Sequence, residues 1–259
     1  MDFDVPSLGR ADGPSLASRL RWRLRRPFYG AYYAVTRANH ERELVATRKR
    51  VGDATFRSYE PLLRHGDDVL LERLLDAVAP GDVVYDVGAN TGVYSLAVAA
   101  SHPDARVVAF EPDPAVRSHL AANVRVNDFA NVAVRGEGVG DETGTRRFFR
   151  STYDELGSFD EARASAWEAR VRGTVEVPVV TLDGLVAAGT PPPDHLKVDV
   201  EGGAAAVLAG ARAVLESARP TVYFEPHDES ERRAVADALA PLGYEIRTRP
   251  DGWVCTPDG

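Results

Sequence analysis

The chain has 259 residues, of which 44% are hydrophobic and 27% are charged, and its net charge of −8 argues against a nucleic acid as its partner. This length and composition fit one α/β domain with an appendage. The single cysteine, Cys255, excludes an internal disulfide framework, and we find neither an apolar run of membrane-spanning length nor a signal-peptide core, so we expect a cytoplasmic protein.

Residues 1–66 are predicted to form an N-terminal basic helical extension. Between residues 15 and 50 there are ten Arg or Lys and two Glu, a net charge of +8 that leaves −16 for the rest of the chain. Leu16, Leu20 and Leu24 recur at helical spacing, and Pro27 should end or kink that helix. Two interpretations stay open: a helical cap packed on the acidic domain, or a basic helix lying peripherally on an anionic membrane. We expect residues 51–66 to be a loop.

From residue 67 to 259 strands and helices alternate, which indicates a parallel sheet with right-handed crossovers. Helices are expected at 67–78, 93–101, 114–126, 181–186, 203–216 and 229–240. Core strands are expected at 83–86, 106–111, 132–135, 195–200 and 221–225, with a terminal antiparallel hairpin at 244–247 and 252–255. Residues 138–180 break this rhythm: two strand-like runs, 146–150 and 174–180, enclose a polar stretch. We expect that stretch, residues 151–173, to be an insertion near the substrate.

Acidic residues end four of the predicted core strands: Asp86, Glu111, Asp199 and Glu225. Ligands of open α/β sheets bind beyond the carboxyl ends of the strands. Four carboxylates there exceed what stability requires, because charges near a core are costly. They indicate a ligand that carries positive charge or many hydroxyl groups.

The turn after the first core strand narrows the choice of ligand. It reads Gly88-Ala89-Asn90-Thr91-Gly92 and lacks the third glycine of a dinucleotide fingerprint. Asp86, just before the turn, would repel a phosphate and attract an ammonium group. S-adenosylmethionine (SAM) has no phosphate but has an amino-acid end, a sulfonium and a ribose diol. In this interpretation Gly88 and Gly92 let the backbone approach SAM, and Glu111, nineteen residues after Gly92, accepts the ribose hydroxyls.

The chain resembles the FkbM-type SAM-dependent methyltransferases over residues 80–245. The resemblance rests on the stretches 85–92, 110–112, 181–183, 197–202 and 224–227, which include Asp86-Val87-Gly88-Ala89-Asn90 and Lys197-Val198-Asp199-Val200-Glu201-Gly202. It implies a class I, Rossmann-like α/β fold with a seven-stranded, mostly parallel sheet and helices on both faces. It also implies SAM as cofactor and O-methylation of a sugar, glycan or secondary metabolite. The cofactor-binding residues are then Asp86, Gly88, Asn90, Gly92, Glu111 and Asp199.

Methyl transfer to an alcohol needs a base that removes the hydroxyl proton. His227, just past the last parallel strand, is the first candidate, because histidine titrates near neutral pH. Asp199 is the second candidate and could instead hold the methionine ammonium. Lys197 should lie on the same side of its strand as Asp199 and orient it. Asp199, Glu201 and Glu225 could also hold Mg²⁺, but no His-rich ligand set is present and we expect no metal.

Two other functions remain open at this stage. One is an NAD-dependent oxidoreductase built on the same strand–turn–helix unit, although the third glycine and a hydride-site pair are missing. The other is a non-catalytic module that binds a nucleotide or a partner. The sequence does not indicate the methyl acceptor or the oligomeric state.

Overall fold

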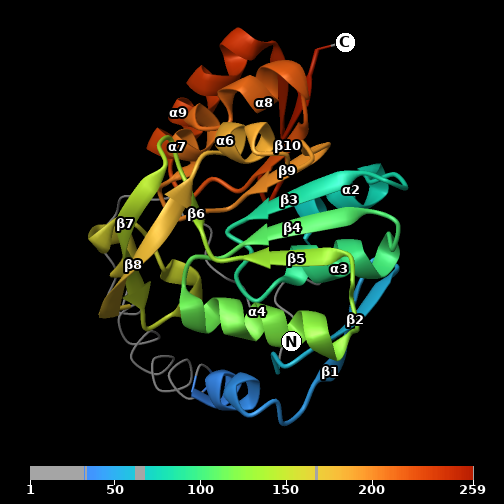
Figure 1. Cartoon of the computed structure of the whole chain (residues 1–259), viewed down its shortest axis with the longest axis vertical. Coiled ribbons are helices and arrows are strands. Elements are labelled where there is room, and N and C mark those ends of the chain that lie inside the picture. The colour runs from blue at the N-terminus through green and yellow to red at the C-terminus, as the bar shows by residue number, and fades with distance from the viewer. Residues whose placement is uncertain (1–31, 33, 62–67, 167–168, 259) are drawn as a thin grey trace.

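A computed structural model describes residues 32, 34–61, 68–166 and 169–258 (Figure 1). Its central sheet has seven strands in the order β11-β12-β10-β9-β3-β4-β5. Their bounds are β3 (Val83–Val87), β4 (Arg106–Phe110), β5 (Val132–Arg135), β9 (His195–Val198), β10 (Thr221–Phe224), β11 (Tyr244–Thr248) and β12 (Trp253–Pro257). The five strands from β10 to β5 are parallel, and the β11–β12 hairpin is antiparallel. The predicted Rossmann-like α/β fold is confirmed.

Two hydrophobic cores cover the two faces of this sheet, because successive side chains of a strand point to opposite faces. Tyr85 and Val87 of β3 belong to one core, and Val84 between them belongs to the other. The first core is covered by α6 (Leu182–Ala187), α7 (Ala204–Ala209), α8 (Arg212–Ser217) and α9 (Glu229–Leu239), which leads into the short η2 (Ala240–Leu242). The second is covered by α2 (Val69–Ala77), α3 (Val93–Ser101) and α4 (Pro114–Val126).

Residues 47–58 form an antiparallel hairpin, so the expectation of a loop from residue 51 onward is wrong there. Strand β1 (Thr47–Val51) pairs with β2 (Ala54–Ser58) through a two-residue turn in which Gly52 has a φ of +52°. Val51, Ala54 and Phe56 are buried in the second core. The structure therefore packs this hairpin into the core of the domain, although it lies before the predicted boundary at residue 66.

The described part of the N-terminal extension also lies against the domain. Residues 34–41 are helical, and the His40 ring stacks on His119 of α4 with ring centroids 4.4 Å apart. The Asn39 side chain bonds to the backbone of the segment after β2, at Tyr59. Leu16, Leu20, Leu24 and Pro27, on which the predicted leucine stripe depends, lie outside the described residues. In the part of the chain that is described, no helix is long and apolar enough to cross a membrane.

The helix expected over residues 203–216 is wrong in one respect: it is two helices, α7 and α8, with a break at Gly210. A Cβ at Gly210 would lie 1.9 Å from the carbonyl oxygen of Gly140, so this backbone approaches a distant loop too closely for any side chain. Asp183 then caps the second helix, accepting hydrogen bonds from the amides of Ala213 and Val214.

The insertion is larger than the expected residues 151–173: residues 138–180 form a small sheet of their own, in the order β6-β8-β7. It consists of β6 (Gly138–Val139), β7 (Gly144–Ser151), the short η1 (Asp154–Leu156), α5 (Glu161–Ala164) and β8 (Val171–Val180). The β7–β8 ladder is longer than predicted and shifts register between Arg150 and Ser151. In Figure 1 the arrowheads of β4 and β5 point toward this small sheet, which therefore stands at the carboxyl edge of the main sheet.

Candidate active site

The strand tips at the carboxyl edge meet where the order of the parallel strands reverses. The chain passes from β3 to β4 and β5 on one side and later returns to β9 and β10 on the other. Such a reversal is the usual ligand site of an open α/β sheet. Among the described residues, the loops that reach it include the glycine turn after β3, the Glu111 loop after β4, the Asp199 loop after β9 and the His227 loop after β10.

The glycine turn is held between β4 and β9. The amides of Gly88 and Ala89 donate to the Phe110 carbonyl at 3.1 and 3.0 Å. Gly88 has a φ of +78°, and a Cβ there would lie 1.8 Å from the Asp199 carbonyl oxygen. Asn90 and Gly92 also have positive φ angles, of 50° and 97°. Any side chain at Gly88 would therefore separate the turn from the Asp199 loop.

Lys197 stands at the centre of a buried charge cluster. It is the register partner of Asp86 on the neighbouring parallel strand, and its Nζ lies 3.0 Å from Asp86 Oδ1 and 3.4 Å from Asp199 Oδ2. The ammonium also donates to the Gly88 carbonyl at 2.9 Å. Burial alone would lower the pKa of Lys197, but the two carboxylates raise it above its usual value. The lysine therefore stays charged and ties the glycine turn to β9.

Asp86 does not lie as the sequence predicts, as an open acid that attracts the cofactor's ammonium group. In the structure its residue is 1% exposed, one oxygen faces Lys197, and the other accepts a hydrogen bond from Ser95 Oγ at 2.6 Å. Because its charge is already compensated, Asp86 supports the turn through Lys197 rather than presenting a free charge.

Glu111 directly follows β4 and lies beside the glycine turn, at the strand tip where the sequence places it. Its Oε2 accepts from the Asn90 amide at 3.0 Å and its Oε1 from the Asp113 amide at 2.8 Å. Burial raises the pKa of Glu111 to about 8, because loss of hydration outweighs these two donors. When Glu111 is ionised, each of its carboxylate oxygens keeps a lone pair for a hydroxyl donor.

His227 and Asp199 are brought together as an acid–base pair. His227 Nε2 lies 3.1 Å from Asp199 Oδ1, and Nδ1 lies 3.7 Å from Glu201 Oε1. Burial by itself lowers the pKa of His227, but the bond to Asp199 and the charges of nearby acids raise it to about 9. Within the described residues no group of three or more His, Cys, Asp or Glu side chains is placed to hold a metal ion.

These contacts form one line of alternating charge across the strand tips. It runs from Asp86 to Lys197, Asp199, His227 and Glu201, with successive nitrogen–oxygen distances of 3.0, 3.4, 3.1 and 3.7 Å. The line connects the glycine turn to the loop after β10, so the candidate cofactor and acid–base residues belong to one cluster.

Glu231, which the sequence analysis missed, joins the two loops that carry this pair. Its Oε2 accepts from the His227 amide at 3.0 Å, and its Oε1 accepts from the Ala204 amide at 3.4 Å, just after the Asp199–Glu201 loop. Glu231 is 6% exposed. Asp228 caps α9 by accepting from the Glu231 amide at 2.8 Å. The spacing Asp228-x-x-Glu231 resembles a capping box and was a usable signal for this arrangement.

The insertion contacts the same loops, and its predicted position near the substrate stays a prediction. Ser158 Oγ donates to the Glu201 carbonyl at 2.7 Å. Arg163 of α5 forms an ion pair with Asp228, directly after His227. The contact residues of the insertion carried no recognisable motif, because their partners lie 43 and 65 positions away in the chain.

Comparison with known protein families matches residues 86–247 to the family described as "Methyltransferase FkbM domain". The chain is 30% identical over 217 residues to the AMB antimetabolite synthetase AmbE of Pseudomonas aeruginosa, covering 66% of this chain but only 10% of AmbE. It is 31% identical to the 31-O-demethyl-FK506 methyltransferase FkbM of Streptomyces tacrolimicus, covering 64% of this chain and 70% of that protein.

A further relative and a solved structure complete the comparison. The hexuronic acid methyltransferase AglP of Haloferax volcanii is 28% identical, covering 74% of this chain and 78% of AglP. The crystal structure of a methyltransferase FkbM from Methylobacillus flagellatus is 18% identical, with a TM-score of 0.49, covering 74% of this chain and 46% of that one.

Proposed function

The chain belongs to the FkbM methyltransferase family, and from this premise we propose that it transfers a methyl group from SAM to a hydroxyl group of a sugar, glycan or secondary metabolite. The observation that carries the proposal is the line of alternating charge described above. Through this line the His227–Asp199 pair and the glycine turn belong to the same cluster of charged residues.

The residues around the glycine turn fit SAM. Glu111 offers carboxylate lone pairs to a ribose diol, and its buried position suits a partner that donates hydrogen bonds. The missing side chain at Gly88 leaves backbone at the site where a cofactor must approach closely. When bound, SAM supplies an activated methyl group on a sulfonium.

His227 would act as the base. Its Nε2 faces Asp199, which fixes the ring, and its Nδ1, 3.7 Å from Glu201 Oε1, is the nitrogen that would accept the proton. Asp199, itself held by Lys197, stabilises the resulting imidazolium. Much of the remaining rate enhancement would come from alignment of the hydroxyl with the methyl group.

The acceptor class is supported by the relatives. Two of them are named for 31-O-demethyl-FK506 and for a hexuronic acid. An acceptor of either kind would present hydroxyl groups to the Asp199–His227 pair. The insertion, which contacts the loops of both residues, would border such an acceptor.

The first experiment tests the cofactor. A bound ligand raises the melting temperature in proportion to the logarithm of its concentration over Kd. SAM and S-adenosylhomocysteine should each stabilise the chain, whereas NAD should not. A shift with NAD and none with SAM would favour an oxidoreductase and overturn the proposal.

The second experiment tests the reaction and finds the acceptor. The chain is incubated with methyl-labelled SAM and a cell extract, and the mixture is then separated into lipid, glycan, small-molecule, protein and nucleic-acid pools. We expect label in a base-stable ether product of the glycan or small-molecule pool. Label confined to protein or nucleic acid would contradict the proposed acceptor class.

A further inference from the structure

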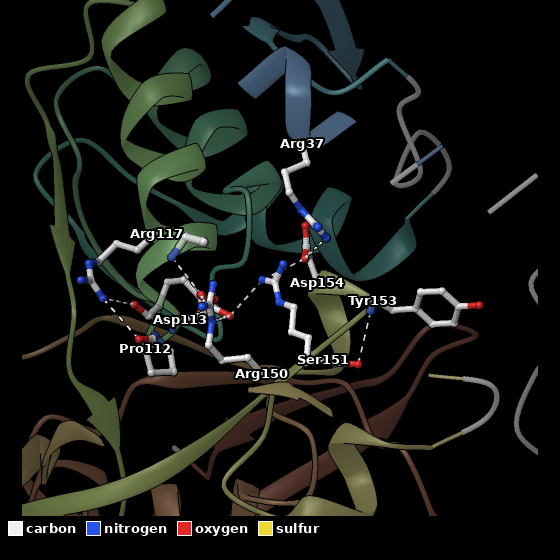
Figure 2. A network of polar contacts seen from close by, with 11 residues as sticks. Arg37, Pro112, Asp113, Arg117, Arg150, Ser151, Tyr153 and Asp154 are labelled. Atoms are coloured by element: carbon white, nitrogen blue, oxygen red, sulfur yellow. Dashed lines mark hydrogen bonds and ion pairs between the residues drawn. The ribbon is translucent and has the colours of Figure 1, made fainter. Parts of the chain in front are cut away.

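A second polar network lies next to the candidate cofactor site and uses none of the acid–base residues. Arg150 Nε lies 3.1 and 3.0 Å from the two carboxylate oxygens of Asp113. Arg172 bridges Asp113 and Asp154 at 3.4 and 3.3 Å, and Arg37 lies 3.4 Å from Asp154. Figure 2 shows Arg37 reaching from the N-terminal helix toward Asp154 while Arg150 points toward Asp113.

The network connects three segments that are distant in the sequence. Asp113 follows β4, Arg150, Asp154 and Arg172 belong to the insertion, and Arg37 belongs to the helical residues 34–41. Along this path the side chains are 4% exposed at Asp113, 19% at Arg172, 10% at Asp154 and 33% at Arg37. A chain of ion pairs thus runs from the interior to the N-terminal extension.

The charges of the network depend on one another. Burial raises the pKa of Asp154, and the guanidinium groups of Arg172 and Arg37 oppose that rise. Burial also acts to raise the pKa of Asp113, but Arg150 and Arg172 outweigh it and keep that pKa below its usual value. Removing one partner of a buried pair leaves the other charge uncompensated. Arg37 compensates part of the charge of Asp154, and Asp154 in turn shares Arg172 with Asp113.

Asp113 is the inner end of the network and contacts Glu111 directly. Its amide donates to Glu111 Oε1 at 2.8 Å, while its own Oδ1 accepts from the Ala115 amide at 2.8 Å and caps α4. The arginine pairs fix the Asp113 side chain, and the cap fixes its backbone. Together they determine where the Glu111 carboxylate stands.

We propose that Asp113 is a positioning residue for the cofactor carboxylate Glu111, and that Arg37 links docking of the N-terminal helix to cofactor binding through Asp154 and Arg172. The inference rests on the proposed function, because it requires Glu111 to bind SAM. Coupling between two sites is reciprocal, so SAM should in turn stabilise the docked helix. The helical residues 34–41 of the basic extension would then contribute to cofactor binding although they lie outside the cofactor site.

The test measures SAM binding to the full chain by calorimetry, which needs no acceptor. Arg37→Ala and Asp154→Asn should each weaken SAM binding by about five-fold or more, the lower end of ordinary coupling between sites. The matched controls are Arg42→Ala, an exposed arginine next to the same helix, and Asp141→Asn, an exposed acid of the insertion. Both controls should bind within about two-fold of the unmodified chain.

Two further measurements separate this role from general destabilisation. The double variant Arg37→Ala with Asp154→Asn should bind about as weakly as Asp154→Asn alone, because Arg37 acts on the cofactor site through its contact with Asp154. Hydrogen exchange of residues 34–41 should slow when SAM is added to the unmodified chain and to Arg42→Ala, but not to Arg37→Ala.

The outcomes are distinct. If the unmodified chain does not bind SAM, the proposed function fails and this inference fails with it. If it binds SAM but Arg37→Ala binds as tightly as Arg42→Ala, the inference alone is overturned. Additive losses of SAM affinity in the double variant would also overturn the coupling. So would hydrogen exchange in residues 34–41 that proceeds at the same rate with and without SAM.

Discussion

At the scale of single residues, the site is governed by how buried charges compensate one another. Lys197 is 3% exposed and lies between Asp86 and Asp199, so neither acid stands alone in a region of low polarity. A buried ion pair of this kind seldom adds stability over an apolar pair. Its value here is geometric, because the same ammonium group also holds the Gly88 carbonyl.

The first prediction concerns the pH dependence of His227. Its pKa is raised from 6.5 to about 9, so the protonated form predominates at neutral pH and the basic form appears as the pH rises toward 9. Methyl transfer at saturating SAM should therefore increase between pH 7 and 9. His227→Gln should lower the rate by about 10²- to 10⁴-fold and abolish this increase.

The same shift has the opposite effect on stability. A folded-state pKa above the unfolded value stabilises the protein fully below about pH 6.5, and the contribution is lost as the pH rises through about 9. The free energy of unfolding, measured by chemical unfolding, should therefore fall between about pH 6.5 and 9 in the unmodified chain, and this fall should be absent in His227→Gln. His102→Gln serves as control, since that ring bonds to the Leu75 carbonyl far from the site. If the rate of methyl transfer by His227→Gln still rose between pH 7 and 9 as in the unmodified chain, His227 would not be the base.

Residue patterns predicted where most residues of the candidate site lie in the fold, but not all of their contacts. Gly88, Glu111 and His227 lie where the sequence places them, because strand ends and glycine turns fix backbone position. The state of Asp86 was not predictable in the same way. Periodicity tells which face of a strand a residue occupies, but not that Lys197, 111 positions later, would be its register partner.

At the scale of elements, the β1–β2 hairpin could have been predicted from local signals in the sequence. Alternation in Ala54-Thr55-Phe56-Arg57-Ser58 and the Gly52-Asp53 turn are hairpin signals in the sequence itself. The break at Gly210 carries no comparable signal, because its cause is the backbone of Gly140. Local patterns therefore predict elements, whereas contacts between distant loops decide where some of them stop.

The second prediction tests whether the hairpin belongs to the domain. Phe56 is 2% exposed and packs in the core beneath α3. Phe56→Ala should lower the free energy of unfolding by about 3–5 kcal/mol, the usual cost of removing a buried aromatic ring. Thr55→Ala, on the exposed face of the same strand, should change it by less than about 0.5 kcal/mol. Urea unfolding measures both, and equal effects would mean that the hairpin contributes little to the core.

The third prediction tests the connection that Glu231 makes between two loops. Glu231→Ala leaves the buried amides of His227 and Ala204 without their partner, which should cost about 1–3 kcal/mol of stability. Glu231→Gln keeps an acceptor oxygen and should cost less. Glu229→Ala is the control, because Glu229 is exposed and pairs with Arg233 on the same helix.

A readout at the histidine distinguishes loop positioning from stability alone. Nuclear magnetic resonance of ¹⁵N-labelled histidine should show an altered His227 titration in Glu231→Ala, since its backbone is no longer fixed opposite Asp199. The Glu229→Ala spectrum should match that of the unmodified chain. Identical titrations in all three proteins would show that Glu231 does not position His227.

At the scale of the whole molecule, charge is unevenly distributed along the chain. Residues 15–50 carry +8 and the remainder −16. In the described part, Arg37 and the stacked His40 contact the domain, so residues 34–41 have partners within the protein. The arginines at positions 19–26 lie before the described residues, and for them contact with an anionic membrane stays a prediction.

The fourth prediction tests that membrane contact with the full chain. Arg23, Arg25 and Arg26 changed to Glu reverse three basic charges in the segment, and each basic residue near an anionic surface contributes about 1 kcal/mol to binding. Sedimentation with phosphatidylserine vesicles at low salt should therefore fall sharply in this variant. Arg147, Arg212 and Arg233 changed to Glu make the same change in net charge at exposed positions of the domain. If both triple variants sediment alike, net charge rather than the extension determines binding, and the extension serves only as the docked segment that Arg37 anchors.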